Sequence, residues 1–206
     1  MPNAFADIAF TPRVRAEQER FGSADAYARV LSPDRDDGAE LGPREAAFLS
    51  ARDGFYQATV SETGWPYVQF RGGMPGFLKV IDARTIGYAD YAGNRQYISV
   101  GNLRLDDRVS LIAVDYARRE RLKLWGRARI TEDPDIVGLL HGDDGPRAER
   151  GIVIRLAAFD WNCPKHIPVR RTEGERDDEI ARLAERIADL EAQLAGRPAM
   201  RRQARP

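Results

Sequence analysis

Three basic side chains and one short loop in the middle of the chain have the types and the spacing that suit phosphate binding. Arg71 ends a β-prone run, Lys79 lies in the next such run, and Arg95 follows a Gly-Asn pair. Apolar residues then recur at helical spacing, which predicts a helix from Asn94, its N-cap, to about Leu103. A helix N-terminus offers free backbone N–H groups and a partial positive charge. We therefore expect the three basic side chains and this helix start to converge on a phosphate.

Short β-prone runs separated by turns are expected to carry these side chains. The runs at 77–81 and 85–91 meet at a short polar connection, which predicts an antiparallel hairpin. The runs at 55–62 and 66–71 flank a Thr-Gly pair and predict a second hairpin. Three further runs of this kind follow, at 108–116, 122–130 and 151–159.

Strands and helices do not alternate along the chain, which argues against a parallel α/β fold. We expect a mainly β protein, an antiparallel barrel with flanking helices. The barrel domain would occupy residues 42–168, between an N-terminal helical leader at 1–41 and a charged C-terminal tail at 169–206. In the leader, Thr11-Pro12 signals one helix start and Ser23 a second helix through Leu31. Flanking helices of the barrel are expected at 43–51 and 134–141.

The charged tail contains one predicted amphipathic helix, at about 176–195. Its apolar residues recur at alternating spacings of three and four, at Ile180, Leu183, Ile187, Leu190 and Leu194. This heptad spacing places them on one face of the helix. Roughly two heptads fall short of the ~3 to 4 that identify a coiled coil. Pairing with a second copy of the helix and packing on the barrel both stay open.

The composition is ordinary for a globular protein, with 43% hydrophobic and 31% charged residues among 206. No apolar run approaches the ~20 residues that cross a bilayer. The first ten residues lack a basic stretch followed by an apolar core, so we expect a cytoplasmic protein that does not bind membranes. The single Cys163 excludes an internal disulfide, and His141 and His166 alone make no zinc cluster.

Positive charge is concentrated in the segment that carries the expected phosphate site. The formal net charge of the chain is zero, yet residues 71–129 hold 12 Arg and Lys against 6 Asp and Glu. Such a surplus attracts anions. It would also suit nucleic acid, but the segment has neither repeated aromatic residues for base stacking nor a nucleic-acid motif. We therefore expect a small anionic ligand and no nucleic-acid partner.

Residues 160–168 are a second stretch with the composition of a ligand site. Trp161 supplies a large flat surface, while Asn162, Lys165 and His166 supply hydrogen-bonding groups directly after the last predicted strand. His166 is either a proton donor or a structural hydrogen-bonding group. A nucleophilic thiol is disfavoured here, because no acidic partner lies nearby in the sequence and a proline follows the cysteine.

Five short motifs follow one another in a fixed order along the barrel domain. They are Arg71, Leu78-Lys79, Ala89-Asp90, Asn94-Arg95-Gln96 and Arg108-Val109-Ser110-Leu111. In this order the chain resembles the pyridoxamine 5'-phosphate oxidase-like family of FMN-binding split barrels, over roughly residues 42–168. The resemblance implies a six-stranded antiparallel split β-barrel. It also implies FMN as cofactor and a homodimer with flavin sites at the subunit interface.

The resemblance assigns cofactor-binding roles to eleven residues. Those expected to hold the flavin phosphate are Arg71, Lys79, Asn94, Arg95 and Gln96. Those expected at the strand ends that hold the flavin ring are Leu78, Ala89 and Asp90. Those expected to close the site are Arg121, Lys123 and Trp161, with Arg121 and Lys123 reaching the flavin of the partner subunit. Since Arg121 and Lys123 share one face of their strand with Trp125, a solvated exterior is the alternative for that face.

Two departures separate this chain from pyridoxamine 5'-phosphate oxidases proper. Their Arg-x-His segment, which binds the pyridoxal substrate, is replaced by the WNCPKHIP sequence at 161–168. This form looks like that of a less characterised flavin-nucleotide-binding branch of the family. Gln96 also stands where the family has Lys. FMN binding therefore carries over better than vitamin B6 oxidation does.

The sequence thus favours an FMN-dependent oxidoreductase that acts on a small-molecule redox substrate. No residue is singled out as catalytic, because a bound flavin carries the hydride chemistry itself. One alternative is a non-catalytic flavin carrier, or a split barrel that binds a deazaflavin or haem. Another is a structural barrel whose basic face is merely solvated.

Overall fold

The computed structural model describes residues 4–28, 38–141 and 147–195 of the chain. It contains two compact units. The larger unit comprises residues 1–115 and 119–167 and holds every described strand. The smaller unit comprises residues 116–118 and 168–206 and holds the last helix.

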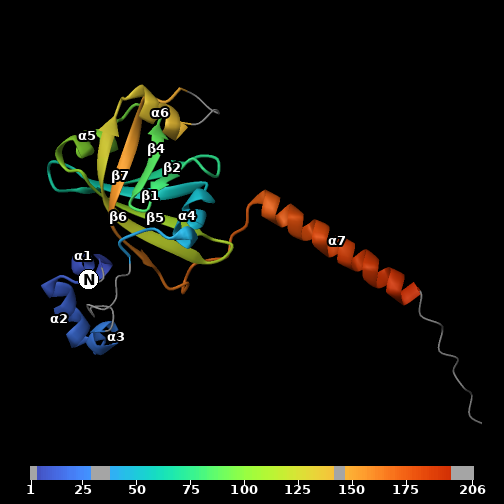
Figure 1. The fold of residues 1–206 in the computed structure, drawn as a ribbon. Helices are drawn as coiled ribbons and strands as arrows, with labels where there is room; N and C mark the ends of the chain where they lie inside the picture. Colours follow the sequence, from blue (N-terminus) through green and yellow to red (C-terminus); the bar gives the residue numbers. More distant parts are fainter. Residues whose placement is uncertain (1–3, 29–37, 142–146, 196–206) are drawn as a thin grey trace, which may run out of the picture. The chain divides into compact units, whose positions relative to one another are not determined.

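The strands of the larger unit form one antiparallel sheet (Figure 1). They are β1 (Gly54–Val60), β2 (Pro66–Gly72), β3 (Lys79–Asp82), β4 (Thr85–Asp90), β5 (Arg108–Asp115), β6 (Glu120–Thr131) and β7 (Arg150–Trp161). Their order across the sheet is β2-β1-β5-β6-β7-β4-β3. The sheet has seven strands, one for each of the seven predicted runs, whereas the family resemblance implied six. The β3–β4 hairpin joins the sheet through the pairing of β4 with β7.

Buried and exposed side chains alternate along the strands, so one face of the sheet packs into a single core. On β5 the buried apolar residues are Val109, Leu111 and Ala113, and on β6 they include Leu122 and Leu124. Successive side chains of a strand point to opposite faces, so each strand contributes every second residue. Figure 1 shows that the sheet curls, and the side chains of the outward set on β5 stay partly exposed.

Helix α4 (Pro43–Ser50) packs Phe48 into the core beside the last strand. The Glu45 carboxylate accepts the Gly42 N–H at 3.0 Å and the Trp161 indole N–H at 2.7 Å. Burial raises the pKa of Glu45, but these hydrogen bonds outweigh it, so the pKa lies below its ordinary value. The charged carboxylate thereby ties the start of α4 to the end of β7.

The leader is helical in its described part. Thr11 caps its second helix by accepting the Val14 N–H at 3.4 Å, as expected from the Thr-Pro pair. On the first helix, the Phe5 ring stacks on Trp125 of β6 at a centroid distance of 5.1 Å. The part of the second predicted helix, capped by Ser23, that reaches Leu31 lies outside the described residues. The described helices are α1 (Ala4–Ala9), α2 (Pro12–Arg20) and α3 (Ala24–Ala28).

Helix α5 (Ile98–Leu105) begins later than predicted, so the assignment of Asn94 as its N-cap is wrong. Arg95 has a φ of 61° and Tyr97 a φ of 52°. A right-handed helix requires negative φ, so the chain cannot become helical before residue 98. Asn94 instead closes a turn, because its Oδ1 accepts the Gln96 N–H at 3.2 Å.

Helix α6 (Pro134–His141) begins at the predicted Asp-Pro pair. Asp133 caps it by accepting the N–H groups of Asp135 at 3.0 Å and Ile136 at 3.4 Å. The helix contacts β4 and β7 and buries Leu140 against them. It therefore covers the same end of the sheet at which β4 terminates.

Helix α7 (Glu173–Ala195) of the smaller unit starts three residues before the predicted position of about 176. The Thr172 hydroxyl accepts the Glu175 N–H at 3.2 Å, and the Glu175 carboxylate accepts the Thr172 N–H at 2.8 Å. This reciprocal capping box defines the start of the helix. Within residues 4–28, 38–141 and 147–195, no helix has the length and apolar character needed to span a membrane.

Candidate functional site

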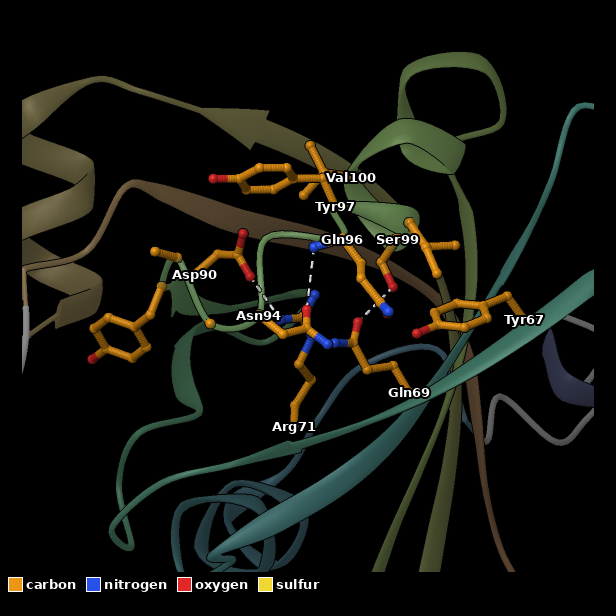
Figure 2. A pocket seen from close by; sticks show the side chains of 13 residues that line it. Tyr67, Gln69, Arg71, Asp90, Asn94, Gln96, Tyr97, Ser99 and Val100 are labelled. Carbon is orange, nitrogen blue, oxygen red and sulfur yellow. Dashed lines mark hydrogen bonds and ion pairs between the residues drawn. The ribbon is translucent and has the colours of Figure 1, made fainter.

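A cavity of about 300 Å³ lies where β2, the end of β4 and the start of α5 meet. Figure 2 shows Gln69 and Arg71 of β2 facing the loop that carries Asn94 and Gln96. The two β2 side chains point the same way because alternate residues of a strand share a face. Gln69 Oε1 accepts the Ser99 hydroxyl at 2.8 Å, which ties β2 to the first turn of α5.

The loop at 93–97 has an unusual backbone, because Gly93, Arg95 and Tyr97 have φ values of 51°, 61° and 52°. The Arg95 N–H donates to the Ala92 carbonyl oxygen at 3.0 Å, and the Gln96 N–H donates to Asn94 Oδ1 at 3.2 Å. These two N–H groups therefore already have acceptors within the loop. The first turn of α5 follows at once and adds free N–H groups and the positive end of its dipole.

A buried carboxylate holds the partly buried Arg71 at the wall of this cavity. Its Nη1 lies 2.7 Å from Asp90 Oδ1, and Arg150 Nε lies 3.7 Å from Asp90 Oδ2. The Asp90 side chain is only 3% exposed. Arg71 Nε is also buried, and none of the residues that the structure describes accepts its hydrogen. Because a buried donor without a partner is costly, this position favours an additional acceptor such as a phosphate oxygen.

A second cavity, of about 520 Å³, adjoins the first and shares Arg71, Tyr91 and Gly93 with it. Its wall includes Lys79 and Ala89, together with the glycine-rich turn at 72–76 and Phe77. The two cavities lie within the range of roughly 300–1,000 Å³ that is typical of small-molecule sites. Together they place a basic, hydrogen-bonding region next to a more apolar one.

The structure gathers six of the predicted site residues at these cavities. Arg71, Lys79, Ala89, Asp90, Asn94 and Gln96 line one or both of them. Leu78 is buried in the core at 1% exposure, so only its backbone can meet a ligand. Arg95 is exposed and is not among the described residues that line either cavity.

Three predicted residues lie elsewhere in the chain. Arg121 and Lys123 are on the outward face of β6, where Lys123 Nζ lies 5.9 Å from the Phe5 ring centroid. The Trp161 indole N–H donates a hydrogen bond to the Glu45 carboxylate on α4, and the Trp161 ring packs edge-on against the Phe48 ring. A single subunit does not bring these three to Arg71, so their assignment to the site stays a prediction that requires a second subunit.

Lys123 pairs across the sheet with Asp160 of β7. Burial raises the pKa of Asp160 above its ordinary value, and the positive charge of Lys123 counteracts part of this rise. The outward face of β6 and β7 therefore carries a cation and a partly buried acid side by side.

Several cavity residues were not predicted from the sequence. Tyr67 and Gln69 could have been found, because they precede Arg71 at intervals of two on the same strand. Ser99 and Val100 could have been predicted as cavity residues only if the start of α5 had been placed at residue 98. Arg150, which approaches Asp90, is separated from it by sixty residues and carried no local signal.

A family model described as Pyridoxamine 5'-phosphate oxidase matches residues 41–161 of the chain. The chain belongs to this family. Members commonly bind flavins, and the matched range contains every strand of the sheet. The match agrees with the resemblance found from the five motifs and with the position of both cavities.

Several solved structures are similar to the chain. HupZ from Group A Streptococcus, as a variant, matches with a TM-score of 0.51 and 13% identity, over 59% of this chain and 99% of that one. An FMN-binding protein from Syntrophomonas wolfei matches with a TM-score of 0.44 and 11% identity, over 72% and 97% of the two chains. General Stress Protein 26 from Bacillus anthracis matches with a TM-score of 0.43 and 12% identity, over 56% and 88%. Among curated proteins no match was found.

Proposed function

We propose that the protein is an FMN-binding flavoprotein that acts as a flavin-dependent oxidoreductase on a small-molecule substrate. The family match supports the flavin, because its members commonly bind one. The observation that carries the proposal is the start of α5, which lines the same cavity as Arg71 and its buried, unpartnered Nε. Phosphate is the part of FMN that a helix start and an arginine recognise.

The residues present fit the phosphate end of FMN. The free Arg71 Nε would gain an acceptor, and its guanidinium is already held by Asp90. Asn94 and Gln96 contribute amide side chains, and Lys79 adds a cation in the adjoining cavity. The backbone around Ala89 and Asp90 lies between the two cavities and would face the ring system. Bound flavin supplies hydride or electron transfer.

We further propose that the working form is a homodimer with its flavin sites at the subunit interface. Members of this family are typically dimeric flavin binders. On the outward side of the sheet, Tyr56, Val68 and Phe70 form an exposed apolar patch, with the Tyr56 and Phe70 rings 5.3 Å apart. An exposed cluster of this kind marks a contact surface. A second subunit on this side would supply Arg121 and Lys123 to the flavin.

The first test is an absorption and fluorescence titration of the purified protein with FMN. We expect stoichiometric binding, with a shifted visible spectrum and quenched flavin fluorescence. A protein that stays colourless after excess FMN is removed would contradict the proposal. Deazaflavin and haem would then be titrated in the same way, since both are alternative ligands of the barrel.

A first prediction concerns Arg71. Replacing it by Ala removes a charged hydrogen bond to phosphate worth about 1.5–3 kcal/mol, so FMN should bind at least about tenfold more weakly. Lys79→Ala should weaken binding in the same direction without disturbing the Asp90 ion pair. The control is Arg84→Ala, because Arg84 forms an exposed ion pair with Glu40 outside both cavities.

If the double variant R71A/K79A binds FMN with less than a threefold loss, the basic residues serve only solvation and the phosphate assignment is wrong. Thermal unfolding of each variant, followed by circular dichroism, separates weakened binding from a damaged fold. This conclusion requires that Arg84→Ala binds FMN and unfolds in the same way as the parent protein.

Turnover separates an oxidoreductase from a flavin carrier. The FMN-loaded protein is mixed with NADH or NADPH, and the oxidation of the nicotinamide is followed in the steady state. Sustained oxidation supports the enzyme. Stoichiometric FMN binding with no reduction of the flavin by any tested donor would support the carrier instead.

A further inference from the structure

The last helix carries an apolar face that its own chain leaves uncovered. All 23 residues of α7 are described and none of them is buried. The five residues of the heptad stripe are between 42% and 64% exposed: Ile180, Leu183, Ile187, Leu190 and Leu194. A contiguous stripe of large aliphatic side chains is an unfavourable surface in water. It therefore needs a partner.

The order of Ile and Leu along the stripe indicates which kind of helix would pack against it. In heptad notation Ile180 and Ile187 occupy a positions, and Leu183 and Leu190 occupy d positions. Ile at a with Leu at d favours a parallel two-stranded coiled coil. We propose that α7 pairs with α7 of a second copy of this chain, in parallel and in register.

The flanking charges agree with this orientation. In a parallel pair the g position of one helix faces the next e position of the other. Arg186 at g would then face Glu191 at e of the second copy, and symmetry repeats this attractive pair. The preceding g residue, Glu179, would face the uncharged Ala184. At the start of the helix, Glu173 would fall at a and Arg176 at d, so each would face its own copy. The favourable part of the parallel interface is therefore residues 179–194.

An antiparallel pairing is less favourable with the same residues. Setting Ile180 against Leu190 of the second copy would bring Arg186 opposite Arg186. It would also place Glu191 opposite Asp177, so both flanks would carry like charges. Like-charge contacts oppose association. The charges of the observed helix thus disfavour this antiparallel register.

The stripe spans only about two heptads, so an isolated pair of such helices would be marginal. A tether changes this, because two helices attached to one dimer experience an effective concentration of roughly millimolar. In this respect the inference rests on the homodimer proposed above. The helices would add a second contact between subunits, outside the flavin sites.

Disulfide trapping in the full-length protein tests the pairing. Cys163 is exposed, so all variants carry Cys163→Ser. Leu190→Cys should form a covalent dimer in most chains under mild oxidation, because residue 190 faces its own copy in a parallel pair. The matched control is Ala188→Cys on the polar side of the same helix, which should stay monomeric in denaturing gels. Adding Ile187→Glu to Leu190→Cys should reduce the trapped fraction at least tenfold.

Each remaining outcome would overturn the inference. Leu190→Cys that fails to crosslink excludes the parallel pair. Crosslinking between mixed Leu190→Cys and Ile180→Cys chains, with neither linking to itself, identifies an antiparallel pair. Crosslinking that Ile187→Glu does not reduce reflects random collision. FMN titration of the same samples is independent of these results, so a failure of the flavin proposal would be seen separately.

Discussion

Two buried polar residues illustrate how single side chains determine the pH response of the barrel. The Tyr88 hydroxyl donates to Gln57 Oε1 at 2.9 Å, and both side chains are almost completely buried. Burial raises the pKa of Tyr88 to about 12, which the nearby Arg71 charge opposes in part. The hydrogen bond requires the neutral phenol, so ionisation of Tyr88 works against the folded state.

The corresponding prediction is a loss of stability in alkali. Because the pKa of Tyr88 is higher in the folded than in the unfolded protein, its contribution is complete below pH 10 and is lost as the pH rises toward 12. Between about pH 9 and about pH 11 the free energy of unfolding should fall by about 1 kcal/mol more than in Tyr88→Phe. Urea denaturation of both proteins measures this difference, and parallel pH profiles would contradict it.

Among the elements, the long β6–β7 pair depends on one small residue. The register between the two strands shifts between Trp125 and Gly126, which marks a β-bulge. A Cβ on Gly126 would lie 2.7 Å from the Arg155 carbonyl oxygen on β7. Glycine is therefore needed here for close approach of the two backbones, and the bulge bends the strands around the core.

A pair of glycine substitutions tests this requirement. Gly126→Ala should lower the free energy of unfolding by about 1–3 kcal/mol, because the rigid β7 backbone must move. Gly101→Ala is the control, since Gly101 lies exposed within α5 and a Cβ there meets no atom within 4 Å. It should stabilise the protein by about 0.5–1 kcal/mol through helix propensity. Equal effects of the two substitutions, measured in urea, would argue against the close approach.

At the scale of the whole molecule, the outward face of the sheet carries an exposed apolar patch to which we have assigned the proposed subunit contact. Tyr56, Val68 and Phe70 lie on neighbouring strands β1 and β2, in register with one another or nearly so. Phe5 of the leader covers Trp125 farther along the same face. The face thus combines a part covered by the leader with a part available to a second subunit.

Val68→Asp tests the proposed interface directly. A carboxylate in an apolar contact is costly to desolvate, so this variant should elute at half the mass of the parent protein in light-scattering chromatography. It should also bind FMN more weakly, because Arg121 and Lys123 of the partner would be lost. Leu139→Asp is the matched control, since Leu139 and Val68 are both 61% exposed and Leu139 lies on α6. An unchanged dimer mass for Val68→Asp would exclude this face.

Local patterns in the sequence were sufficient for the strands, most helix starts and the basic residues of the site. Alternating side chains predicted β5 and β6, and the Asp133-Pro134 pair predicted α6. These features depend on neighbouring residues only, through strand alternation and capping. For the same reason the order of Arg71 and Lys79 was enough to suggest an anion site.

Only the tertiary structure decided how that site is completed. The left-handed residues at 95 and 97 delay α5, and no composition rule predicts an Arg and a Tyr in that conformation. The cluster of Arg71, Asp90 and Arg150 forms because β4 pairs with β7 and lies across the cavity from β2. Long-range strand pairing brings together residues that are far apart in the chain. Local sequence patterns depend on neighbouring residues only, so they cannot predict which distant residues will meet.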